Sequence, residues 1–207
     1  MTEQTALSSG MAARARPEII AMKGYVSARS LVESGSSTVF LDANECPYEP
    51  FVGASGLARY PMQQPPELLA VVCDWLDLSS RNVSIMRGAD EGIDSLMRAF
   101  CVPAVDNIIV CPPTFAMYRQ SAILQGVEVR EAPLAEGFAL DVDGVIAAVD
   151  DNTKLVFVCS PNNPTANLMD RQAVERLCLS LAGRALVVVD ETYIEYAGVD
   201  SLSLIHI

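Results

Sequence analysis

From about residue 65 onward, short apolar runs alternate with segments in which apolar residues recur every three or four positions. The runs are typical of buried strands, and the longer spacing is typical of amphipathic helices. Their alternation predicts an α/β fold with a largely parallel sheet and right-handed crossovers. The predicted strands are Asn82–Met86, Asn107–Cys111, Gly126–Glu131, Leu155–Cys159 and Ala185–Val189. The last of these is wholly apolar and is expected to be buried on both faces.

The predicted helices fill the segments between these strands. One carries Leu68, Leu69, Val72, Trp75 and Leu76, and a second begins after Gly88 and carries Ile93, Leu96, Met97 and Phe100. The remaining helices cover about Phe115–Leu124, about Val142–Val149, and a segment with Val174, Leu177, Cys178 and Leu181 on one face.

The first 60 residues lack this regular alternation. Residues 1–16 are small and polar, which is typical of a disordered terminus, and Pro17–Ser37 favours a short helical arm and a turn. Val39–Asp42 predicts a short strand. We divide the chain into an N-terminal segment and arm at 1–40, a partial large domain at 41–201 and a tail at 202–207. The tail reads LSLIHI, which a transposase mosaic-end sequencing adapter also encodes, so we expect it to be non-native; the alternative is a natural apolar tail.

Composition narrows the class of protein. A formal net charge of −12 disfavours a nucleic-acid or anionic membrane partner. The six cysteines are scattered without a CxxC pair and the single histidine is His206, so no metal site is expected. Cysteines within apolar patterns suggest a reducing compartment, and the N-terminus lacks a signal-peptide core. We therefore expect a cytoplasmic protein without membrane spans.

Chemically distinctive residues follow several predicted strands, where ligands bind in open α/β sheets. Gly88 opens a helix whose first N–H groups, those of Ala89 and Asp90, can bind an anion such as phosphate. The alternative is that Asp90 only caps the helix. Phe115 follows Pro112-Pro113-Thr114 and can either stack on a flat ligand or join the core.

Two further turns carry an amide and a carboxylate. Two prolines restrict the loop around Asn163, whose amide can bind a ring hydroxyl, although an Asn-Pro turn is also common. Asp190 ends the last strand, with Tyr193 three residues on, and the carboxylate is either a ligand group or a local cap. Together these groups suit a planar, phosphorylated ligand with a basic ring nitrogen and a hydroxyl, which pyridoxal 5'-phosphate (PLP) provides.

The motifs at these turns resemble those of histidinol-phosphate aminotransferases, which belong to the aspartate-aminotransferase-like, fold-type I PLP enzymes. The matching motifs, in family order, are LDANE at 41–45, RYP at 59–61, RGADEGI at 87–93, RAFC at 98–101, CPPTFAMY at 111–118, CSPNNPT at 159–165 and VVDETYIE at 188–195. This chain departs from the pattern at Phe115, where the family more often has tyrosine, and at Ala166, where it usually has glycine.

The resemblance implies a role for each candidate. The backbone amides of Ala89 and Asp90 would hold the PLP phosphate, Phe115 would stack on the ring, and Asp190 would pair with the ring nitrogen. Asn163 and Tyr193 would bind the ring hydroxyl. Tyr60 would reach the cofactor of a neighbouring subunit, which implies a homodimer, and Tyr25 and Asn44 would lie near the substrate. The implied reaction moves an amino group between glutamate and imidazole-acetol phosphate in histidine biosynthesis.

Such an enzyme needs a Schiff-base lysine, and the only lysines are Lys23 and Lys154. Lys23 lies in the arm and Lys154 at the wrong end of its strand, so neither is expected to serve. We therefore expect an N-terminal fragment that lacks the small domain and is inactive alone. The alternatives are another fold-type I enzyme, such as a threonine-phosphate decarboxylase or an aromatic-amino-acid aminotransferase, or a non-catalytic PLP-binding protein.

Overall fold

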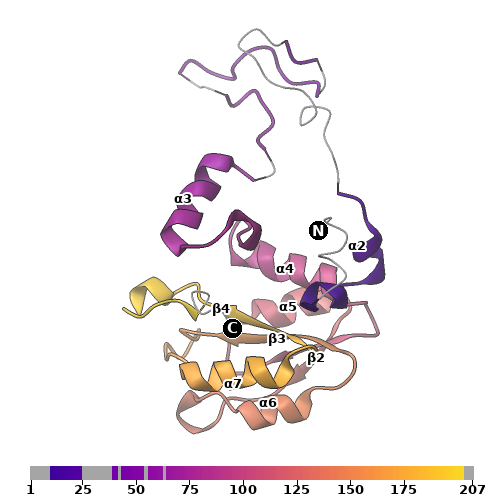
Figure 1. Cartoon of the computed structure of the whole chain (residues 1–207), viewed down its shortest axis with the longest axis vertical. Coiled ribbons are helices and arrows are strands. Elements are labelled where there is room, and N and C mark those ends of the chain that lie inside the picture. Colours follow the sequence, from indigo (N-terminus) through magenta and orange to yellow (C-terminus); the bar gives the residue numbers. More distant parts are fainter. Residues whose placement is uncertain (1–9, 25–38, 42, 54–55, 63, 203–207) are drawn as a thin grey trace. The chain divides into compact units, whose positions relative to one another are not determined.

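A computed structural model describes residues 10–24, 39–41, 43–53, 56–62 and 64–202 (Figure 1). Tyr25, most of the predicted arm and the final five residues lie outside this range. The chain forms two compact units, one of Met22–Ile85 and one that combines the N-terminal residues up to Ala21 with Met86 onward. We call the second the sheet unit.

The sheet unit is built on four parallel strands in the order β2-β1-β3-β4. The strands are β1 (Asn107–Val110), β2 (Glu128–Glu131), β3 (Thr153–Cys159) and β4 (Leu186–Asp190). The predicted parallel α/β fold is confirmed, and these four strands match their predicted positions within two residues at either end. The hydrophobic runs predict these strands correctly because all four residues of β1 and six of the seven residues of β3 are buried.

Helices cover both faces of this sheet, which gives three layers (Figure 1). Helices α4 (Ala89–Phe100) and α5 (Met117–Leu124) pack on one face, against a buried cluster that includes Ile108, Leu155 and Phe157. Helices α6 (Val142–Ala148) and α7 (Arg171–Leu181) pack on the other face, against Ile109, Val156 and Val158. The alternating side chains of β1 and β3 therefore supply both halves of the core.

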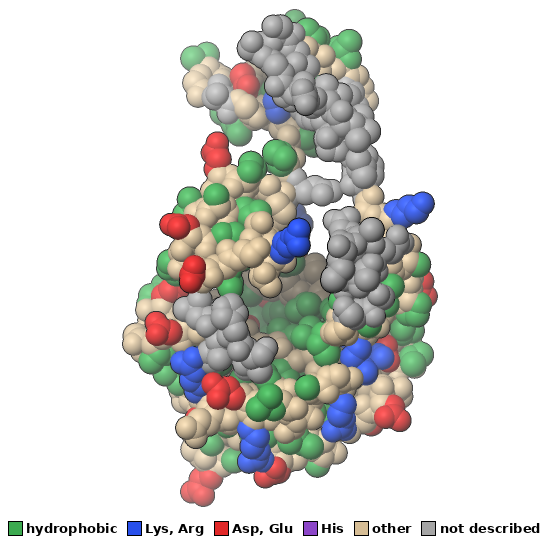
Figure 2. Space-filling view, in the orientation of Figure 1, with side chains coloured by type: hydrophobic (Ala, Val, Ile, Leu, Met, Phe, Trp, Pro, Cys, Tyr) green, Lys and Arg blue, Asp and Glu red, His purple; other side chains and the backbone are tan. Residues whose placement is uncertain are grey.

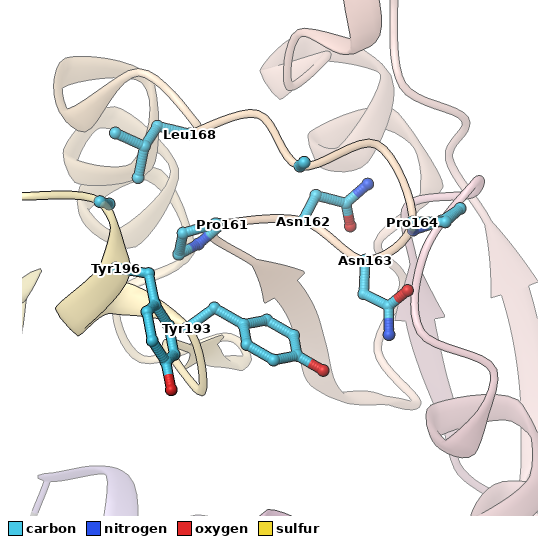
Figure 3. A pocket seen from close by; sticks show the side chains of 9 residues that line it. Pro161, Asn162, Asn163, Pro164, Leu168, Tyr193 and Tyr196 are labelled. Carbon is cyan, nitrogen blue, oxygen red and sulfur yellow. The ribbon is translucent and has the colours of Figure 1, made fainter.

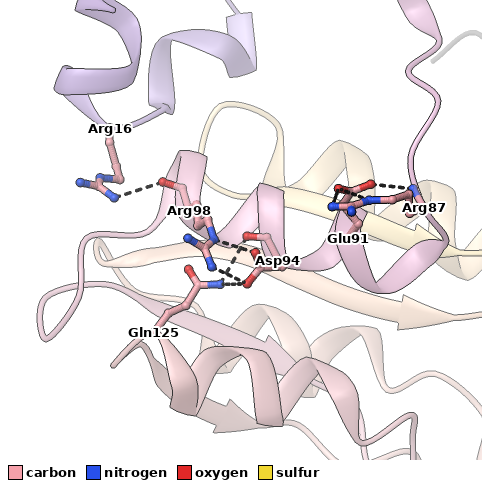
Figure 4. A network of polar contacts seen from close by, with 6 residues as sticks. All are labelled: Arg16, Arg87, Glu91, Asp94, Arg98 and Gln125. Carbon is pink, nitrogen blue, oxygen red and sulfur yellow. Dashed lines mark hydrogen bonds and ion pairs between the residues drawn. The ribbon is translucent and has the colours of Figure 1, made fainter. Parts of the chain in front are cut away.

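The short N-terminal elements of the sheet unit bond to α4 through Arg16. They are a 3₁₀ helix at Gly10–Arg14 and α2 (Pro17–Ala21). The Arg16 N–H donates to the carbonyl of Ala99 over 2.8 Å, and its guanidinium donates to the carbonyl of Arg98. Figure 4 shows this contact beside Asp94, which accepts from Arg98 on its own helix and from Gln125 at the end of α5. These bonds fix α4 between the N-terminal segment and α5.

The smaller unit contains α3 (Pro66–Leu76) and a 3₁₀ helix at Ser80–Asn82. Helix α3 confirms the predicted helix, but the strand predicted at Asn82–Met86 is wrong. The amide side chain of Gln64 bonds both the N–H (2.6 Å) and the carbonyl (3.1 Å) of Ile85, so a side chain takes the place of a neighbouring strand. The strand predicted at Val39–Asp42 is also wrong, because residues 39–41 form no ladder with any described strand.

Strand β4 differs from its prediction in burial. Every one of its residues is only half-buried, whereas the apolar run predicts burial on both faces. Within the described residues β4 pairs with β3 alone and therefore lies at an edge of the sheet. Figure 2 shows acidic and basic side chains interspersed over the visible face of the sheet unit, so the net negative charge is not gathered in one patch there.

Candidate functional site

The carboxyl ends of β1, β3 and β4 meet at one edge of the sheet, because the three strands are parallel and in close register. Cys159 pairs with Asp190, and Val110 pairs with Phe157. The loops that leave this edge are Pro112–Ala116, Ser160–Asp170 and the turn after Asp190. Phe115, Asn163, Asp190 and Tyr193 thus belong to neighbouring loops, as the sequence predicts.

A pocket of about 540 Å³ opens at this edge (Figure 3). The side chains of Asn163 and Tyr193 extend toward the same space in it, one from the loop after β3 and the other from the turn after β4. The pocket therefore combines an amide, a phenol and apolar walls. Its lining residues are Pro161, Asn162, Asn163, Pro164, Ala166, Leu168, Tyr193, Tyr196 and Ala197.

Asp190 is held at both carboxylate oxygens. Its Oδ2 accepts from the hydroxyl of Tyr118 over 2.6 Å. Its Oδ1 accepts from the backbone N–H (3.1 Å) and hydroxyl (2.7 Å) of Thr192. One oxygen thus makes a local turn contact, while the other is bound by a different element, and the 3₁₀ helix that follows at Ile194–Tyr196 has Tyr193 and not Asp190 as its N-cap residue. A carboxylate has about four acceptor positions, so it can accept a further donor.

Tyr118 was not among the residues predicted from the sequence. It is fully buried in α5, stacks on Phe157 with ring centroids 4.8 Å apart, and meets Phe115 edge to face at 5.6 Å. Burial raises the pKa of its phenol, and the hydrogen bond to Asp190 raises it further, so the hydroxyl remains a donor. The sequence contains a signal for this role. Tyr118 stands four residues before Ala122, so both lie on the buried face of a helix, and a buried hydroxyl needs a hydrogen-bond partner.

Asn162 is a second residue whose part the sequence did not reveal. Its buried amide donates to the carbonyl of Pro113 (2.8 Å) and to the hydroxyl of Thr165 (2.6 Å), and it accepts from the hydroxyl of Thr114 (3.0 Å). These bonds tie the loop after β1 to the loop after β3. Asn162 therefore fixes the backbone next to both Asn163 and Phe115.

Helix α4 begins at the predicted glycine turn. Gly88 is its N-cap residue, with a φ of 87°, and a glycine has no side chain that could cap the helix. Asp90 is the second residue of the helix and so does not occupy the N-cap position, and Ala89 and Asp90 are exposed at the helix start. Because α4 leads through a short loop into the amino end of β1, it runs antiparallel to that strand, and its first turn is directed toward the carboxyl edge.

Two acidic side chains, Asp90 and Glu91, lie in this first turn, and Glu91 is already engaged. Glu91 accepts from the backbone N–H of Arg87 over 2.6 Å and from its guanidinium over 2.7 Å (Figure 4). These hydrogen bonds lower the pKa of Glu91. The open N–H groups of a helix N-terminus favour an anion, and the side chain of Glu91 is held by Arg87.

Two other candidates lie in the smaller unit. Asn44 and Tyr60 line one pocket of about 330 Å³ within that unit, so the structure brings these two residues together. The Tyr60 backbone N–H donates to Glu45, whose other oxygen accepts from Arg59. The third candidate of this group, Tyr25, lies outside the described residues.

Lys154 lies at the opposite end of β3, as predicted, where its ammonium group pairs with Asp106 at 3.6 Å. The described residues contain no group of three or more His, Cys, Asp or Glu side chains placed to hold a metal ion. No helix in the part of the chain that the structure describes is long and apolar enough to cross a membrane.

Several solved structures share this fold. The chain superimposes on the histidinol-phosphate aminotransferase from Sinorhizobium meliloti, solved in complex with pyridoxal-5'-phosphate, with a TM-score of 0.61 and 23% identity over 66% of this chain and 37% of that one. It also superimposes on the tyrosine aminotransferase from Leishmania infantum with a TM-score of 0.60 and 26% identity over 65% and 36% of the two chains.

Sequence comparison gives stronger matches. The chain is 44% identical to the histidinol-phosphate aminotransferase of Aliivibrio fischeri strain MJ11 over 88% of its own length and 52% of that protein. It is 43% identical to histidinol-phosphate aminotransferase 1 of Haemophilus influenzae strain 86-028NP, over 87% and 51%. The chain thus spans about half the length of the curated relatives it matches.

The family profile described as aminotransferase class I and II matches residues 39–204, a range that includes nearly all of the sheet unit and every described candidate residue. The motifs, the parallel sheet and the similarity to the relatives named above lead to the same result. The chain belongs to the class I and II aminotransferase family.

Proposed function

We propose that this protein binds PLP at the carboxyl edge of its sheet and serves in amino transfer between glutamate and imidazole-acetol phosphate. The observation that carries the cofactor part is Asp190, a carboxylate at the tip of β4 that is oriented at both oxygens and keeps capacity for a further donor. The remaining donor set fits the other groups of PLP.

Each proposed contact uses chemistry present at this edge. Asp190 would pair with the protonated ring nitrogen, and Asn163 and Tyr193, which share a pocket, would bind the ring hydroxyl. Phe115 would stack on the ring, and the first N–H groups of α4, at Ala89 and Asp90, would hold the phosphate. PLP with a protonated ring nitrogen supplies an electron sink for chemistry at the amino carbon.

The substrate part of the proposal rests on the relatives. Those named above are histidinol-phosphate aminotransferases at 43–44% identity. We therefore infer that amino transfer from glutamate to imidazole-acetol phosphate gives L-histidinol phosphate and 2-oxoglutarate. These two products are the substrates when the reaction runs in reverse. By the same family resemblance, Tyr60 would reach the cofactor phosphate of a second subunit in a homodimer, and Tyr25 and Asn44 would lie near the substrate.

A PLP titration tests the cofactor part. We expect one equivalent of PLP to bind, followed by its absorbance and fluorescence, and Asp190→Asn to weaken binding by about tenfold or more, because the ion pair with the ring nitrogen is lost. Asp151→Asn removes the same charge from an exposed site at the amino edge and should leave affinity unchanged. Equal affinity of the Asp190→Asn variant and the unchanged chain would contradict the proposed contact.

The attachment of PLP is tested separately. Because Lys154 lies at the opposite edge of the sheet, we expect borohydride treatment of the PLP-loaded chain to leave no stoichiometric adduct at this residue. We also expect no adduct at Lys23. Peptide mass mapping of the treated protein checks both lysines. A specific adduct at either lysine would show that the sequence argument about the missing lysine is wrong.

The substrate is tested on the product of the complete gene. With 2-oxoglutarate as acceptor, we expect transamination of L-histidinol phosphate to proceed with a much higher kcat/KM than that of L-tyrosine. A preference for L-tyrosine would favour the aromatic-amino-acid alternative, and release of carbon dioxide from phosphothreonine would favour the decarboxylase.

A further inference from the structure

Tyr118 connects two residues on which the proposed cofactor site depends. Its hydroxyl donates to Oδ2 of Asp190 over 2.6 Å, and its ring contacts Phe115 edge to face with centroids 5.6 Å apart. The three residues come from three different parts of the chain, namely α5, the end of β4 and the loop after β1. Tyr118 therefore links the carboxylate to the aromatic ring across the sheet edge.

The environment of Tyr118 leaves it little freedom to move. Its ring is fully buried and lies nearly parallel to that of Phe157 in β3, with an interplanar angle of 14° and centroids 4.8 Å apart. A buried hydroxyl without a partner is costly, so the bond to Asp190 is strongly favoured. Because burial raises the pKa of this phenol, the hydroxyl stays protonated and acts as a permanent donor.

The carboxylate of Asp190 is oriented from two sides. Tyr118 holds Oδ2 from the buried side, and Thr192 holds Oδ1 from the exposed turn. Rotation of the carboxylate about its Cβ–Cγ bond would break bonds at both oxygens. Loss of the Tyr118 hydroxyl would leave only the contacts at the exposed turn, and a carboxylate held at one oxygen samples more orientations.

We propose that Tyr118 is a positioning residue that holds Asp190 and Phe115 in the arrangement that binds a flat ligand with a protonated ring nitrogen. The inference rests on the proposed function, since it takes Asp190 as the partner of that nitrogen. Tyr118 itself contacts no part of the ligand. It acts by keeping the acceptor at the ring nitrogen fixed before the ligand arrives.

The test compares two ligands that differ in one ring atom. One is PLP, and the other is its carbon analogue, 1-deaza-pyridoxal phosphate, in which a C–H replaces the ring nitrogen. We expect the unchanged chain to prefer PLP and Tyr118→Phe to reduce that preference by about tenfold, which corresponds to one charge-assisted hydrogen bond. The affinity for the carbon analogue should stay within about twofold, because the substituted phenylalanine ring keeps the packing on Phe157 and Phe115.

A matched control removes a buried hydroxyl far from the site. Thr153, at the amino end of β3, is fully buried and donates to Oδ1 of Asn107 over 2.8 Å. Thr153→Val should lower the melting temperature without changing the preference for PLP over the carbon analogue. A merely structural role of Tyr118 would produce the same pattern as this control.

Two further variants test whether Tyr118 acts through Asp190. In an Asp190→Asn background, Tyr118→Phe should have no additional effect on the preference. Thr192→Val removes a donor from the other oxygen at an exposed position, so it perturbs the same carboxylate with little risk to folding, and it should reduce the preference in the same direction.

The outcomes separate this inference from the function on which it rests. If the unchanged chain does not distinguish the two ligands, Asp190 does not pair with a ring nitrogen, and both the proposed function and the inference are overturned. If the unchanged chain distinguishes them and the Tyr118→Phe variant does so equally well, only the inference is overturned, whatever the Thr192→Val variant does.

Discussion

Replacement of Asn162 by alanine tests whether the loops at the carboxyl edge are held by one buried amide. Asn162 is 2% exposed and makes three side-chain hydrogen bonds, to Pro113, Thr114 and Thr165. Asn162→Ala removes all three. Two of these bonds join the loop after β1 to the loop after β3, so the substitution should loosen both loops at once.

The magnitude follows from the number of bonds. At a net value of about 1 kcal/mol each, the three bonds stabilise the fold by roughly 3 kcal/mol. For a chain of this size that corresponds to a fall in melting temperature of roughly 6–12 °C. The affinity for PLP should fall as well, because the neighbouring Asn163 and the Phe115 ring lose their fixed backbone.

Urea unfolding followed by circular dichroism measures the change in the free energy of unfolding, and a PLP titration of the same variant measures the change in affinity. The matched control is Asn152→Ala, which removes an exposed amide at the amino edge and should change stability by no more than about 0.5 kcal/mol. If Asn162→Ala unfolds at the same urea concentration as the control, the argument from buried hydrogen bonds is refuted.

Three further predictions concern strain, acid stability and thiol reactivity. Ala166 adopts a φ of 61°, a conformation that favours glycine, so Ala166→Gly should raise the free energy of unfolding by about 1 kcal/mol in urea titrations, and a loss of stability would contradict this. The side-chain bond from Asn107 lowers the pKa of Asp150 to about 2, so the stability that this carboxylate contributes is present above its ordinary pKa and is lost as the pH falls toward 2. Asp150→Asn should therefore flatten the dependence of unfolding free energy on pH below about 4, and an unchanged slope would count against it. Burial raises the pKa of the Cys111 thiol to about 12, so iodoacetamide at pH 8 should label exposed Cys46 and leave Cys111 intact in native protein, as read by mass spectrometry, whereas equal labelling would be inconsistent with the described core.

The sequence predicted the sheet unit well because its elements are strongly patterned. The runs in β1 and β3 are almost fully buried, and the apolar face of α7 is formed by Val174, Leu177 and Leu181, as the spacing requires. The prediction failed at Asn82–Met86, where a side chain at Gln64 satisfies the backbone in place of a strand. Such a contact between distant residues leaves no periodic signal.

The candidate site shows the same division. Asn163, Asp190 and Tyr193 are predicted as candidates because each stands in a short motif at the end of a strand, and the structure places them in neighbouring loops. Tyr118 and Asn162 were missed, because their parts are defined by partners on other elements, Asp190 for the first and Pro113 for the second. Hydrophobic patterning shows that Tyr118 faces the core, but it does not show which buried acceptor the hydroxyl meets there.

A crystal structure of the chain with PLP tests the proposed cofactor site most directly. We predict the ring against Phe115, its nitrogen within hydrogen-bond distance of Asp190, and the phosphate on the first N–H groups of α4. Electron density for PLP at any other place, with the Asp190 carboxylate still bonded only to Tyr118 and Thr192, would contradict the account.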